Sequence, residues 1–400
     1  MKAPILTNSN LGAPVSGPNG TLMPFDFRPL NRVVFGAGSV ARLGELAREL
    51  GGSRALLVTD PGLERAGHPQ RAQQALRDAG IPAHVFDEVK ENPTNRQVDA
   101  GVRFAREQGI DIIVAVGGGS SMDCAKGINF LLSNGGTMAD YKGFGRAAKP
   151  MLPSIGVPTT AGTGSEAQCY ALITDESSHL KMACGDKKAA FQIAILDPEL
   201  TVSQPRNVAA VTGIDALAHA IESYVCTRRT PVSQIWSLHA FRHIEPNLER
   251  VLVEPNNLDA RSSMQIGSHF AGIAIENAML GICHSCANPL TAHYGIAHGA
   301  AIGILLPHVV RFNAPVVEHL YADLIGHREG SNGEPASEIL AQRIRELLAF
   351  AGQAYRLRDC GVSQSILHLL AEEARQQWTA NFNPRPVTEA DLEKVYEAAW

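Results

Sequence analysis

The stretch that organises this chain reads DIIVAVGGGSSMDCAKGINF and occupies positions 111–130. Its apolar start has the length and the β-branched character of a strand buried on both faces. Gly117, Gly118, Gly119 and Ser120 follow, and a helical pattern begins at about Ser121. Successive glycines let backbone N–H groups approach an oxygen closely, and a helix N-terminus adds partial positive charge. The stretch therefore predicts a strand, a turn and a helix that together form a seat for a pyrophosphate.

The same alternation extends on both sides of this stretch, from about residue 32 to residue 205. Amphipathic segments at 38–50, 62–79 and 95–108 separate most of the β-rich runs. Such alternation predicts βαβ units and a mainly parallel sheet. The runs are RVVF (32–35), ALLVTD (55–60), AHVF (83–86), DIIVAV (111–116), PSIGV (153–157) and QIAILD (192–197).

After about residue 206 the β-rich runs stop, and Ala, Leu, Glu and Arg recur at helical spacing. We therefore expect the second half to be almost entirely helical. Residues 1–24, rich in Pro, Gly, Asn and Ser, are expected to form a flexible arm, and 328–337 an exposed loop. The expected helical segments are 206–226, 232–250, 258–280, 336–350, 362–377 and 388–398.

The composition excludes several classes of protein. A chain of 400 residues with 45% hydrophobic and 19% charged residues is typical of a soluble globular enzyme of two domains. A net charge of −5 without a run of Lys or Arg offers no footprint for nucleic acid. No window approaches the roughly 18 uncharged apolar residues of a membrane span. Seven scattered cysteines favour reduced thiols in a cytoplasmic protein.

Two other segments are also candidates for binding a dinucleotide, either in place of the 117–120 loop or together with it. VVFGAGSVARLGELA (33–47) carries Gly-x-Gly-x-x-Ala after a strand, and Asp60 follows about 20 residues later. VPTTAGTGSEA (157–167) joins a strand to small hydroxyl and glycine residues. Any single loop of this kind is also compatible with a tight turn that binds nothing. Asp60 has two interpretations: it accepts hydrogen bonds from the adenosine ribose, which favours NAD over NADP, or it caps a turn.

A candidate metal site begins on the segment GIDALAHAIESYV (213–225). Asp215 and His219 are four residues apart, so both project from one face of a helix within reach of one ion. Glu222 lies near that face and is a candidate partner for a ligand. Such a pair alone is more often a helical hydrogen bond than a metal site.

A second segment, GICHSCANPLTAHYGIAHG (281–299), changes those odds because it carries three histidines. An Asp with two or three His suits Fe(II) or Zn(II), and an open coordination position could polarise an alcohol or carbonyl oxygen. Cys283 and Cys286 have no second C-x-x-C to complete a zinc site. We interpret them as small core residues, with a redox pair as the alternative.

Taken together, these motifs resemble the iron-containing (group III) alcohol dehydrogenase family. The resemblance covers about residues 32–400, and PTTAGTGSE and GIDALAHAIE are its most specific parts. The matching segments are VVFGAGS, LLVTD, ENPT, GGGSSMDCAK, VPTTAGTGSEA, LKMA, GIDALAHAIESYV, GICHSCANPLTAHYGIAHGAAIGILLPHV and NPRPVTEADLEKVYEAAW.

The resemblance implies an α/β fold class of dehydroquinate-synthase type. An N-terminal Rossmann-like, parallel-sheet NAD-binding domain (25–205) would precede an all-α metal-binding domain (206–400), with the active site between them. The resemblance assigns pyrophosphate binding to the loop at 117–120. It assigns the GAGS segment at 36–39 to the point where the chain enters the fold. It implies the metal ligands Asp215, His219, His284 and His298. Contacts to NAD are implied for Asp60, Asn92, Gly118, Gly119, Ser120, Asp123, Thr159, Thr160, Thr163, Ser165 and Lys181.

The sequence also departs from the family pattern. Asn288 stands where family members commonly have a histidine beside the nicotinamide, and an amide orients a hydroxyl but cannot shuttle a proton. His293 is not a family ligand position, so we expect a cleft or packing histidine. Ile275 begins a substrate wall, IENA, that replaces the common AFSNA pattern. The expected catalytic residues are His284, Asn288 and His298.

The implied activity is hydride transfer between a small alcohol and NAD, with a divalent metal, Fe(II) before Zn(II), and the reverse reduction of an aldehyde or ketone. The alternatives are a maleylacetate-reductase-like reductase, an NAD-using metal-dependent lyase, and a nucleotide-binding scaffold with a dead site. The resemblance implies a homodimer or larger homo-oligomer in the cytoplasm, with no nucleic acid and no membrane partner.

Overall fold

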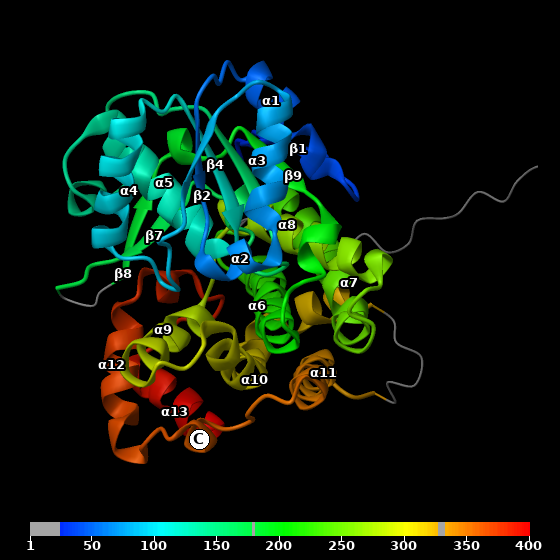
Figure 1. The fold of residues 1–400 in the computed structure, drawn as a ribbon. Helices are drawn as coiled ribbons and strands as arrows, with labels where there is room; N and C mark the ends of the chain where they lie inside the picture. The colour runs from blue at the N-terminus through cyan, green and yellow to red at the C-terminus, as the bar shows by residue number, and fades with distance from the viewer. Residues whose placement is uncertain (1–24, 178–180, 327–332) are drawn as a thin grey trace, which may run out of the picture.

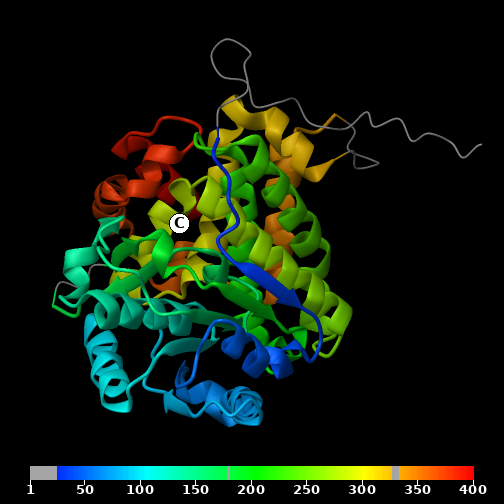
Figure 2. The ribbon, with the colours of Figure 1, turned by 90° about the horizontal axis from the view of Figure 1, so that it is seen from above.

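The computed structural model describes residues 25–177, 181–326 and 333–400. The predicted arm at 1–24 and the first half of the predicted loop at 328–337, residues 328–332, lie outside these described residues. The α/β part occupies the upper half of Figure 1, and helices α9 to α13 lie below it. From residue 25 the chain crosses over the helical part before it enters the sheet (Figure 2).

The main sheet has six strands, and all of its pairs are parallel. Each of the six β-rich runs contains one strand, so these predictions are confirmed. Leu57 pairs with Val114, and Val114 pairs in turn with Ile155, which fixes the register at the centre of the sheet. The strands in spatial order are β1 (Arg32–Phe35), β9 (Ile193–Leu196), β6 (Ser154–Pro158), β4 (Ile112–Gly117), β2 (Ala55–Val58) and β3 (Ala83–Phe86).

Helices cover both faces of this sheet, which is why its strands are apolar throughout. Leu57 and Val114 pack on one face among residues of α1 (Leu43–Glu49) and α3 (His68–Asp78). Leu56 and Ile113 pack on the other face with α4 (Asn95–Gln108) and α5 (Gly119–Asn134). These four strand residues are fully buried. A strand buried on both faces needs no polar alternation.

The predicted helix at 62–79 is two helices. α2 (Pro61–Ala66) ends at Gly67, and α3 begins directly after it. Gly67 has φ 79°, a left-handed conformation that ends a helix and that glycine adopts without strain. The amphipathic pattern runs across this break, so the pattern alone suggested one helix.

The crossovers from the neighbouring strands β2 and β4 leave on opposite faces of the sheet. β2 connects through α3, and β4 connects through α5. Where such connections diverge, a crevice opens outside the carboxyl ends of the two strands, and open α/β sheets bind ligands there. The segment from Gly117 to Ser120 lies at this point.

A second, three-stranded sheet was not expected. β5 (Gly143–Phe144) pairs with β8 (Lys181–Gly185), and β8 pairs antiparallel with β7 (Tyr170–Thr174). The prediction of a mainly parallel fold therefore missed an antiparallel pair. Its strands are at most 5 residues long and lack the apolar runs of the main sheet.

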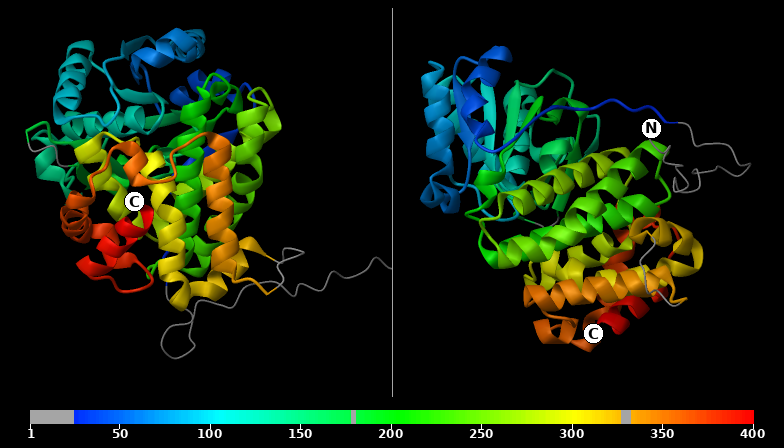
Figure 3. Two further views of the ribbon diagram at one scale, coloured as in Figure 1. Left: turned by 90° about the horizontal axis from the view of Figure 1, so that it is seen from below. Right: turned by 90° about the vertical axis from the view of Figure 1, so that its right-hand side faces the viewer.

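Helices make up the rest of the described chain, as predicted, and no strand follows β9 within it. Figure 3 shows the green helices between the blue-to-cyan α/β part and the orange-to-red end of the chain. Helices α9 and α10 were not predicted, because histidines and glycines interrupt their apolar pattern. The helices are α6 (Arg206–Val225), α7 (Pro231–Val253), α8 (Leu258–Asn277), α9 (Ile282–Tyr294), α10 (His298–Ile325), α11 (Ala336–Ala351), α12 (Leu367–Gln376) and α13 (Glu389–Ala399).

Short 3-10 helices complete the described elements. Three of them carry residues of the site described below: η3, η4 and η8. Their bounds are η1 (Ser39–Arg42), η2 (Met138–Tyr141), η3 (Ser165–Ala167), η4 (Lys187–Ala189), η5 (Pro198–Thr201), η6 (Leu357–Cys360), η7 (Gln364–Ile366) and η8 (Trp378–Phe382).

Helix α10 is long and apolar enough to cross a membrane by length and composition, although no membrane span was predicted from the sequence. Of its most apolar 18-residue window, 61% is buried inside the protein. Its residues Ile302, Leu306 and Val310 belong to the core shared with α6 and α11. A helix that is apolar on every side is expected in the core of a large protein as well as in a membrane.

Candidate active site

One cavity of about 1800 Å3 lies between the α/β part and the helices. Its wall joins the glycine loop after β4 to residues of α6, α9 and α10. All of the predicted cofactor, metal and catalytic residues line it except Asp60 and Thr159. The lining predicted residues are Asn92, Gly118, Gly119, Ser120, Asp123, Thr160, Thr163, Ser165, Lys181, Asp215, His219, His284, Asn288 and His298.

The start of α5 is open to this cavity. Gly118 is the N-cap residue of the helix, and none of the described side chains caps it. A Cβ on Gly119 would lie 2.8 Å from Thr163 Cγ2, so a glycine is needed for the two loops to come together. The free N–H groups of a helix start favour an anion. The geometry thus agrees with a pyrophosphate seat at this loop.

The competing glycine loop at 36–39 already has an anion of its own. The carboxylate of Asp197 accepts hydrogen bonds from the N–H groups of Gly38 and Val40, each at 3.1 Å. Asp197 is fully buried. This loop therefore links β1 and η1 to the end of β9. The N–H groups of Gly38 and Val40 are not available to a nucleotide phosphate.

Asp60 takes the capping role that was one of its two interpretations. Its carboxylate accepts hydrogen bonds from Gly62 N at 2.8 Å and Leu63 N at 3.2 Å, at the start of α2. It does not line the cavity, although it follows β2 at the crevice. Thr159 is buried and is also absent from the lining.

The third loop, 157–167, is held in place by the helical part. Gly164 has φ 60°, and a Cβ there would come within 2.7 Å of Gly272 Cα on α8. The side chain of Glu166, next to Ser165, is 3.0 Å from His269 Nδ1 of the same helix. The loop that carries Thr160, Thr163 and Ser165 therefore depends on helix α8 for its position.

A buried lysine beneath this loop was not predicted. Lys126 Nζ donates to Ser165 O at 2.7 Å, Ser165 Oγ at 2.9 Å and Tyr170 O at 2.9 Å. Ser165 Oγ in turn donates to Asp123 Oδ1 at 2.8 Å. Burial lowers the pKa of Lys126 and raises the pKa of Asp123, since each charged form loses water. A lone lysine in the apolar helix α5 was the signal that could have indicated this network.

The predicted metal residues converge on Asp215. Its Oδ1 lies 3.5 Å from His219 Nε2, 3.4 Å from His284 Nε2 and 3.7 Å from His298 Nε2. Ligand atoms of Asp215, His284 and His298 lie within 4.8 Å of one another. The ring of His219 stacks on that of His284, with centroids 4.8 Å apart.

Glu222 orients one of these histidines, as the sequence suggested. Its Oε2 hydrogen-bonds His284 Nδ1, and its Oε1 accepts from Cys283 N at 2.8 Å. With Nδ1 held in this way, the other ring nitrogen, Nε2, faces Asp215. A carboxylate behind a histidine is the usual device for fixing the tautomer of a metal ligand.

The protonation of the cluster follows from its burial and its charges. Burial lowers the pKa of His298 to about 3, so this imidazole is neutral. Burial also opposes the charging of His284, but Glu222 and Asp215 outweigh it and raise the pKa of His284 to about 9. Burial opposes the charging of Asp215 as well, but the three histidines lower its pKa below the usual range.

The donor set fits a divalent cation. Asp215 Oδ1 and His284 Nε2 are buried, and neither makes a well-formed hydrogen bond within the described part of the chain. A buried carboxylate facing three imidazoles without hydrogen bonds between them is costly in a protein that holds nothing there. An Asp and three His match the preferences of Fe(II) and Zn(II).

Asn288 lies one helical turn beyond His284 on α9 and lines the cavity. Its Nδ2 donates to Gln377 Oε1 at 3.2 Å. Glu276 belongs to the segment IENA, which differs from the family pattern. Its carboxylate accepts hydrogen bonds from the backbone N and the Sγ of Cys169, each at 3.0 Å. Ile275 and Asn277 line the cavity beside it.

His293 is not in the cleft. It lies near the end of α9, where its Nε2 is 2.9 Å from Glu373 of α12, and its side chain is 33% exposed. The expectation of a cleft role is therefore wrong, and His293 instead pairs with Glu373 between α9 and α12. His293 and the ligand His284 are nine positions apart on one helix, so their side chains point in different directions.

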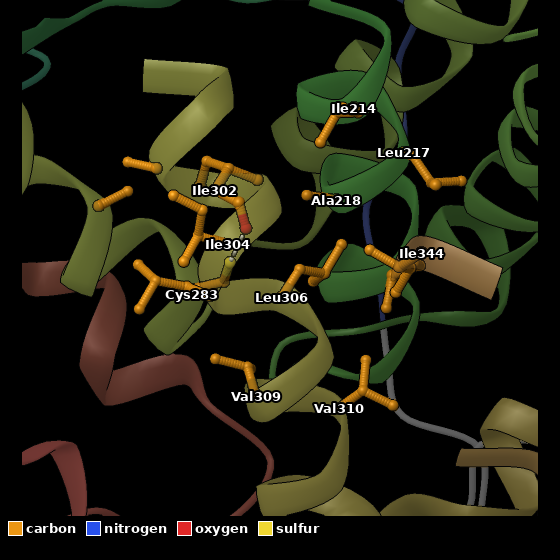
Figure 4. Close-up of a cluster of buried hydrophobic side chains, with 14 of the residues drawn as sticks. Ile214, Leu217, Ala218, Cys283, Ile302, Ile304, Leu306, Val309, Val310 and Ile344 are labelled. Carbon is orange, nitrogen blue, oxygen red and sulfur yellow. Dashed lines mark hydrogen bonds between the residues drawn. The ribbon is translucent and has the colours of Figure 1, made fainter. Parts of the chain in front are cut away.

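The two cysteines near His284 belong to the core. Figure 4 shows Cys283 among Ile302, Ile304 and Leu306, with its Sγ donating to Ile302 O at 3.5 Å. Burial raises the pKa of Cys283 far above its usual value and that of Cys286 to about 12. All seven cysteines are free. These buried thiols are not poised for redox chemistry, in agreement with the interpretation as core residues.

Comparisons with known proteins cover nearly the whole described chain. The family described as iron-containing alcohol dehydrogenase matches residues 30–198, and the C-terminal part of the Fe-containing alcohol dehydrogenase family matches residues 209–400. A 1,3-propanediol dehydrogenase from Citrobacter freundii is 35% identical over 382 residues, covering 94% of this chain and 99% of that protein.

Two further comparisons agree with these matches. An NAD-dependent methanol dehydrogenase from Bacillus methanolicus is 33% identical over 374 residues, covering 92% of this chain and 97% of that protein. A solved structure of 1,3-propanediol oxidoreductase is similar with a TM-score of 0.91 at 35% identity, covering 94% of this chain and all of that one. The chain belongs to the iron-containing alcohol dehydrogenase family.

Proposed function

We propose that this protein oxidises an alcohol with NAD, or reduces the corresponding aldehyde or ketone, with a bound divalent metal that is Fe(II) before Zn(II). The observation that carries the proposal is that one cavity is lined both by the open start of α5 and by the cluster around Asp215. One element offers N–H groups to a dinucleotide phosphate, and the other offers ligands to a cation. Their shared wall supports a reaction between the two.

Four side chains would hold the metal: Asp215, His219, His284 and His298. NAD would contact the residues of the two loops that line the cavity, together with Asn92 and Lys181. These last two side chains are joined by a hydrogen bond of 3.0 Å from Lys181 Nζ to Asn92 Oδ1. The cofactor set is Asp60, Asn92, Gly118, Gly119, Ser120, Asp123, Thr159, Thr160, Thr163, Ser165 and Lys181, of which Asp60 and Thr159 have the least support from the cavity.

When bound, NAD exchanges a hydride with the substrate carbon, and the cation stabilises the negative charge that develops on the substrate oxygen. The protein positions these groups. Glu222 holds the ring of His284, and Lys126 holds the loop that carries Ser165. Asn288 orients a hydroxyl or a water through its amide. Positioning of this kind contributes much of the rate of a transfer reaction.

The proposed domains are an NAD-binding domain at 25–205 and a metal-binding domain at 206–400. We also propose a homodimer or larger homo-oligomer in the cytoplasm. The outermost strand β1 supports an oligomer, because Val33 and Phe35 are 40% and 45% exposed on it. The free cysteines support a reducing compartment.

Metal analysis of protein purified without chelator, coupled to a screen of alcohols, diols, hydroxy acids and their carbonyls with NAD(H), tests the proposal. We expect about one metal ion per chain and NADH formed in proportion to the alcohol oxidised. A lyase would use NAD without net NADH release. A maleylacetate-reductase-like enzyme would keep its activity after chelation. A scaffold would bind NADH without turnover of any compound.

A further inference from the structure

Three aromatic rings lie in a row along the wall of the cavity. Trp378 follows Gln377, which accepts the hydrogen bond of Asn288. The ring of Trp378 is 5.8 Å from that of Tyr170, and the ring of Tyr170 is 5.9 Å from that of Phe144. We call Trp378, Tyr170 and Phe144 the aromatic row, and all three line the cavity.

Both ends of the aromatic row are open to solvent. Phe144 is 54% exposed and Trp378 is 41% exposed. Large apolar side chains exposed within a cavity indicate an apolar ligand surface. The three rings come from β5, β7 and η8, which lie far apart in the sequence. A body much longer than that of a three-carbon diol is needed to cover the row.

Cations accompany the aromatic row along the cavity. Lys142 precedes β5, Lys187 begins η4, and Arg228 lies in the connection between α6 and α7. All three are exposed and line the cavity. The guanidinium carbon of Arg228 is 5.5 Å from the centroid of Phe382, whose ring contacts Trp378 at 6.0 Å. No ion pair involves these three cations within the described residues.

The carboxylate of Glu276 lies beside the aromatic row, because it is hydrogen-bonded to Cys169, the residue before Tyr170. Glu276 also lines the cavity, but its two oxygens are engaged by the backbone N–H and the thiol of Cys169. Arg229, next to Arg228, directs Nη1 to the carbonyls of Val225 and Cys226 at the end of α6, at 3.2 and 3.0 Å. The neutral donors of Cys169 leave the negative charge of Glu276 in place, so the charges that an anionic ligand would match are the exposed cations Lys142, Lys187 and Arg228, which no described carboxylate pairs.

We propose that the alcohol or aldehyde taken by this site has an apolar body and an anionic group at the far end from the reacting carbon. This inference rests on the proposed function and names its substrate class. The apolar body lies along the aromatic row, and the anion, a carboxylate, sulfonate or phosphate, faces Lys142, Lys187 and Arg228. The redox step is unchanged: the carbinol carbon loses a hydride to NAD, and the hydroxyl proton passes to solvent.

A matched series of primary alcohols tests the class. The series is 4-(hydroxymethyl)benzoate, 4-(hydroxymethyl)benzenesulfonate, 4-(hydroxymethyl)phenyl phosphate, benzyl alcohol and 1,3-propanediol. We expect kcat/KM for the best anionic member to exceed that for benzyl alcohol by about tenfold at low salt, and the three anions distinguish the head group. Raising the ionic strength should reduce this ratio, because salt screens exposed charges. A ratio of one or below, independent of salt, would overturn the inference.

Charge-removal variants locate the effect. Arg228→Met should lower the ratio of kcat/KM for the benzoate to that for benzyl alcohol by about fivefold, the upper range for one exposed ion pair. The double variant K142M/R228M should lower it further. Arg77→Met removes one exposed positive charge from α3, outside the cavity, and should leave the ratio unchanged. A rise in KM for NAD with an unchanged ratio would mean that these cations serve the cofactor, and would refute the proposal.

A third variant tests the apolar body. Trp378→Leu should raise KM for benzyl alcohol relative to 1,3-propanediol while the far-ultraviolet circular dichroism stays unchanged. If both substrates change together, the aromatic row does not contact the substrate. If neutral alcohols are oxidised without preference for anionic ones, this inference fails and the proposed function stands. If no alcohol in the series or in the wider screen yields NADH, the proposed function fails, and the inference fails with it.

Discussion

The variant Glu222→Gln tests whether His284 must be held by a carboxylate in order to bind metal. The carboxylate accepts two hydrogen bonds, from Cys283 N at 2.8 Å and from His284 Nδ1. A glutamine supplies one acceptor oxygen for these two donors. If that oxygen serves Cys283 N, the amide N–H2 group faces His284 Nδ1. The ring is then favoured as the tautomer protonated at Nε2, which points its proton at Asp215.

Loss of such an orienting partner lowers metal affinity about 10- to 100-fold, or about 1.4 to 2.7 kcal/mol. We expect this loss in a competition titration of the metal-depleted protein with Zn(II) and a chromogenic chelator. NADH binding, followed by fluorescence, should persist and would show that the variant is folded.

The chain offers a matched control in Glu166→Gln. Glu166 is also a buried carboxylate against a histidine, 3.0 Å from His269 Nδ1, but that histidine is not in the metal cluster. This control should keep the metal affinity of the native protein. Equal metal affinity in Glu222→Gln and the native protein would refute the reasoning, and equal losses in both variants would show a general effect of lost buried charge.

Four further predictions concern other parts of the molecule. Asp60→Asn keeps the cap of α2 but removes a charge, so the NAD-to-NADP ratio of kcat/KM should fall about tenfold; an unchanged ratio would leave Asp60 as a cap alone. Because the pKa of His284 is raised to about 9 in the metal-free protein, Zn(II) affinity should rise with pH up to about 9. The same pKa shift stabilises the metal-free fold, fully so below about pH 6.5. This stabilisation should be lost as the pH rises through 9, which denaturation of the apoprotein at a series of pH values would show. Asn288→His should add an ionisation near pH 6.5 to the profile of kcat, whereas superimposable profiles would remove this position from the proton path. Leu57→Ala, at a fully buried position of β2, should lower the free energy of unfolding by about 2–5 kcal/mol in urea titrations. A smaller change would mean that neighbouring core side chains move in to fill the space left by the leucine side chain.

The strands of the main sheet could be predicted because each satisfies a local rule. A strand such as β4 is buried on both faces, so the run 112–116 is apolar without interruption. The pair Asp215 and His219 could be recognised for a similar reason, since the spacing of four residues places both on one helical face. The join at Gly117 to Ser120 was visible because a parallel strand followed by glycines and a helix is itself a local pattern.

Other features depend on contacts between distant segments. β7 and β8 are short, and their pairing gains stability from packing under α5 rather than from a long apolar run. The helical spacing places His293 away from His284, but its pairing with Glu373 depends on the position of α12, which the spacing of histidines does not contain. For Asp60, the same sequence fits a helix cap and a ribose ligand, and only the folded structure shows that its carboxylate caps α2.

Local patterns in the sequence were therefore enough for the family, the strands of the main sheet, the change to helices after them, and the candidate residues for cofactor and metal binding. They reach only as far as one strand, one turn or one helical face. The tertiary structure was needed to bring His284 and His298 to Asp215 and to place Glu222 against His284. It was also needed to show that the glycine loop at 36–39 donates hydrogen bonds to Asp197. The aromatic row and the cations near it are also brought together only by the tertiary structure. The physical reason is that these contacts join residues many positions apart, and their geometry is set by how helices and sheets pack rather than by the periodicity of any one element.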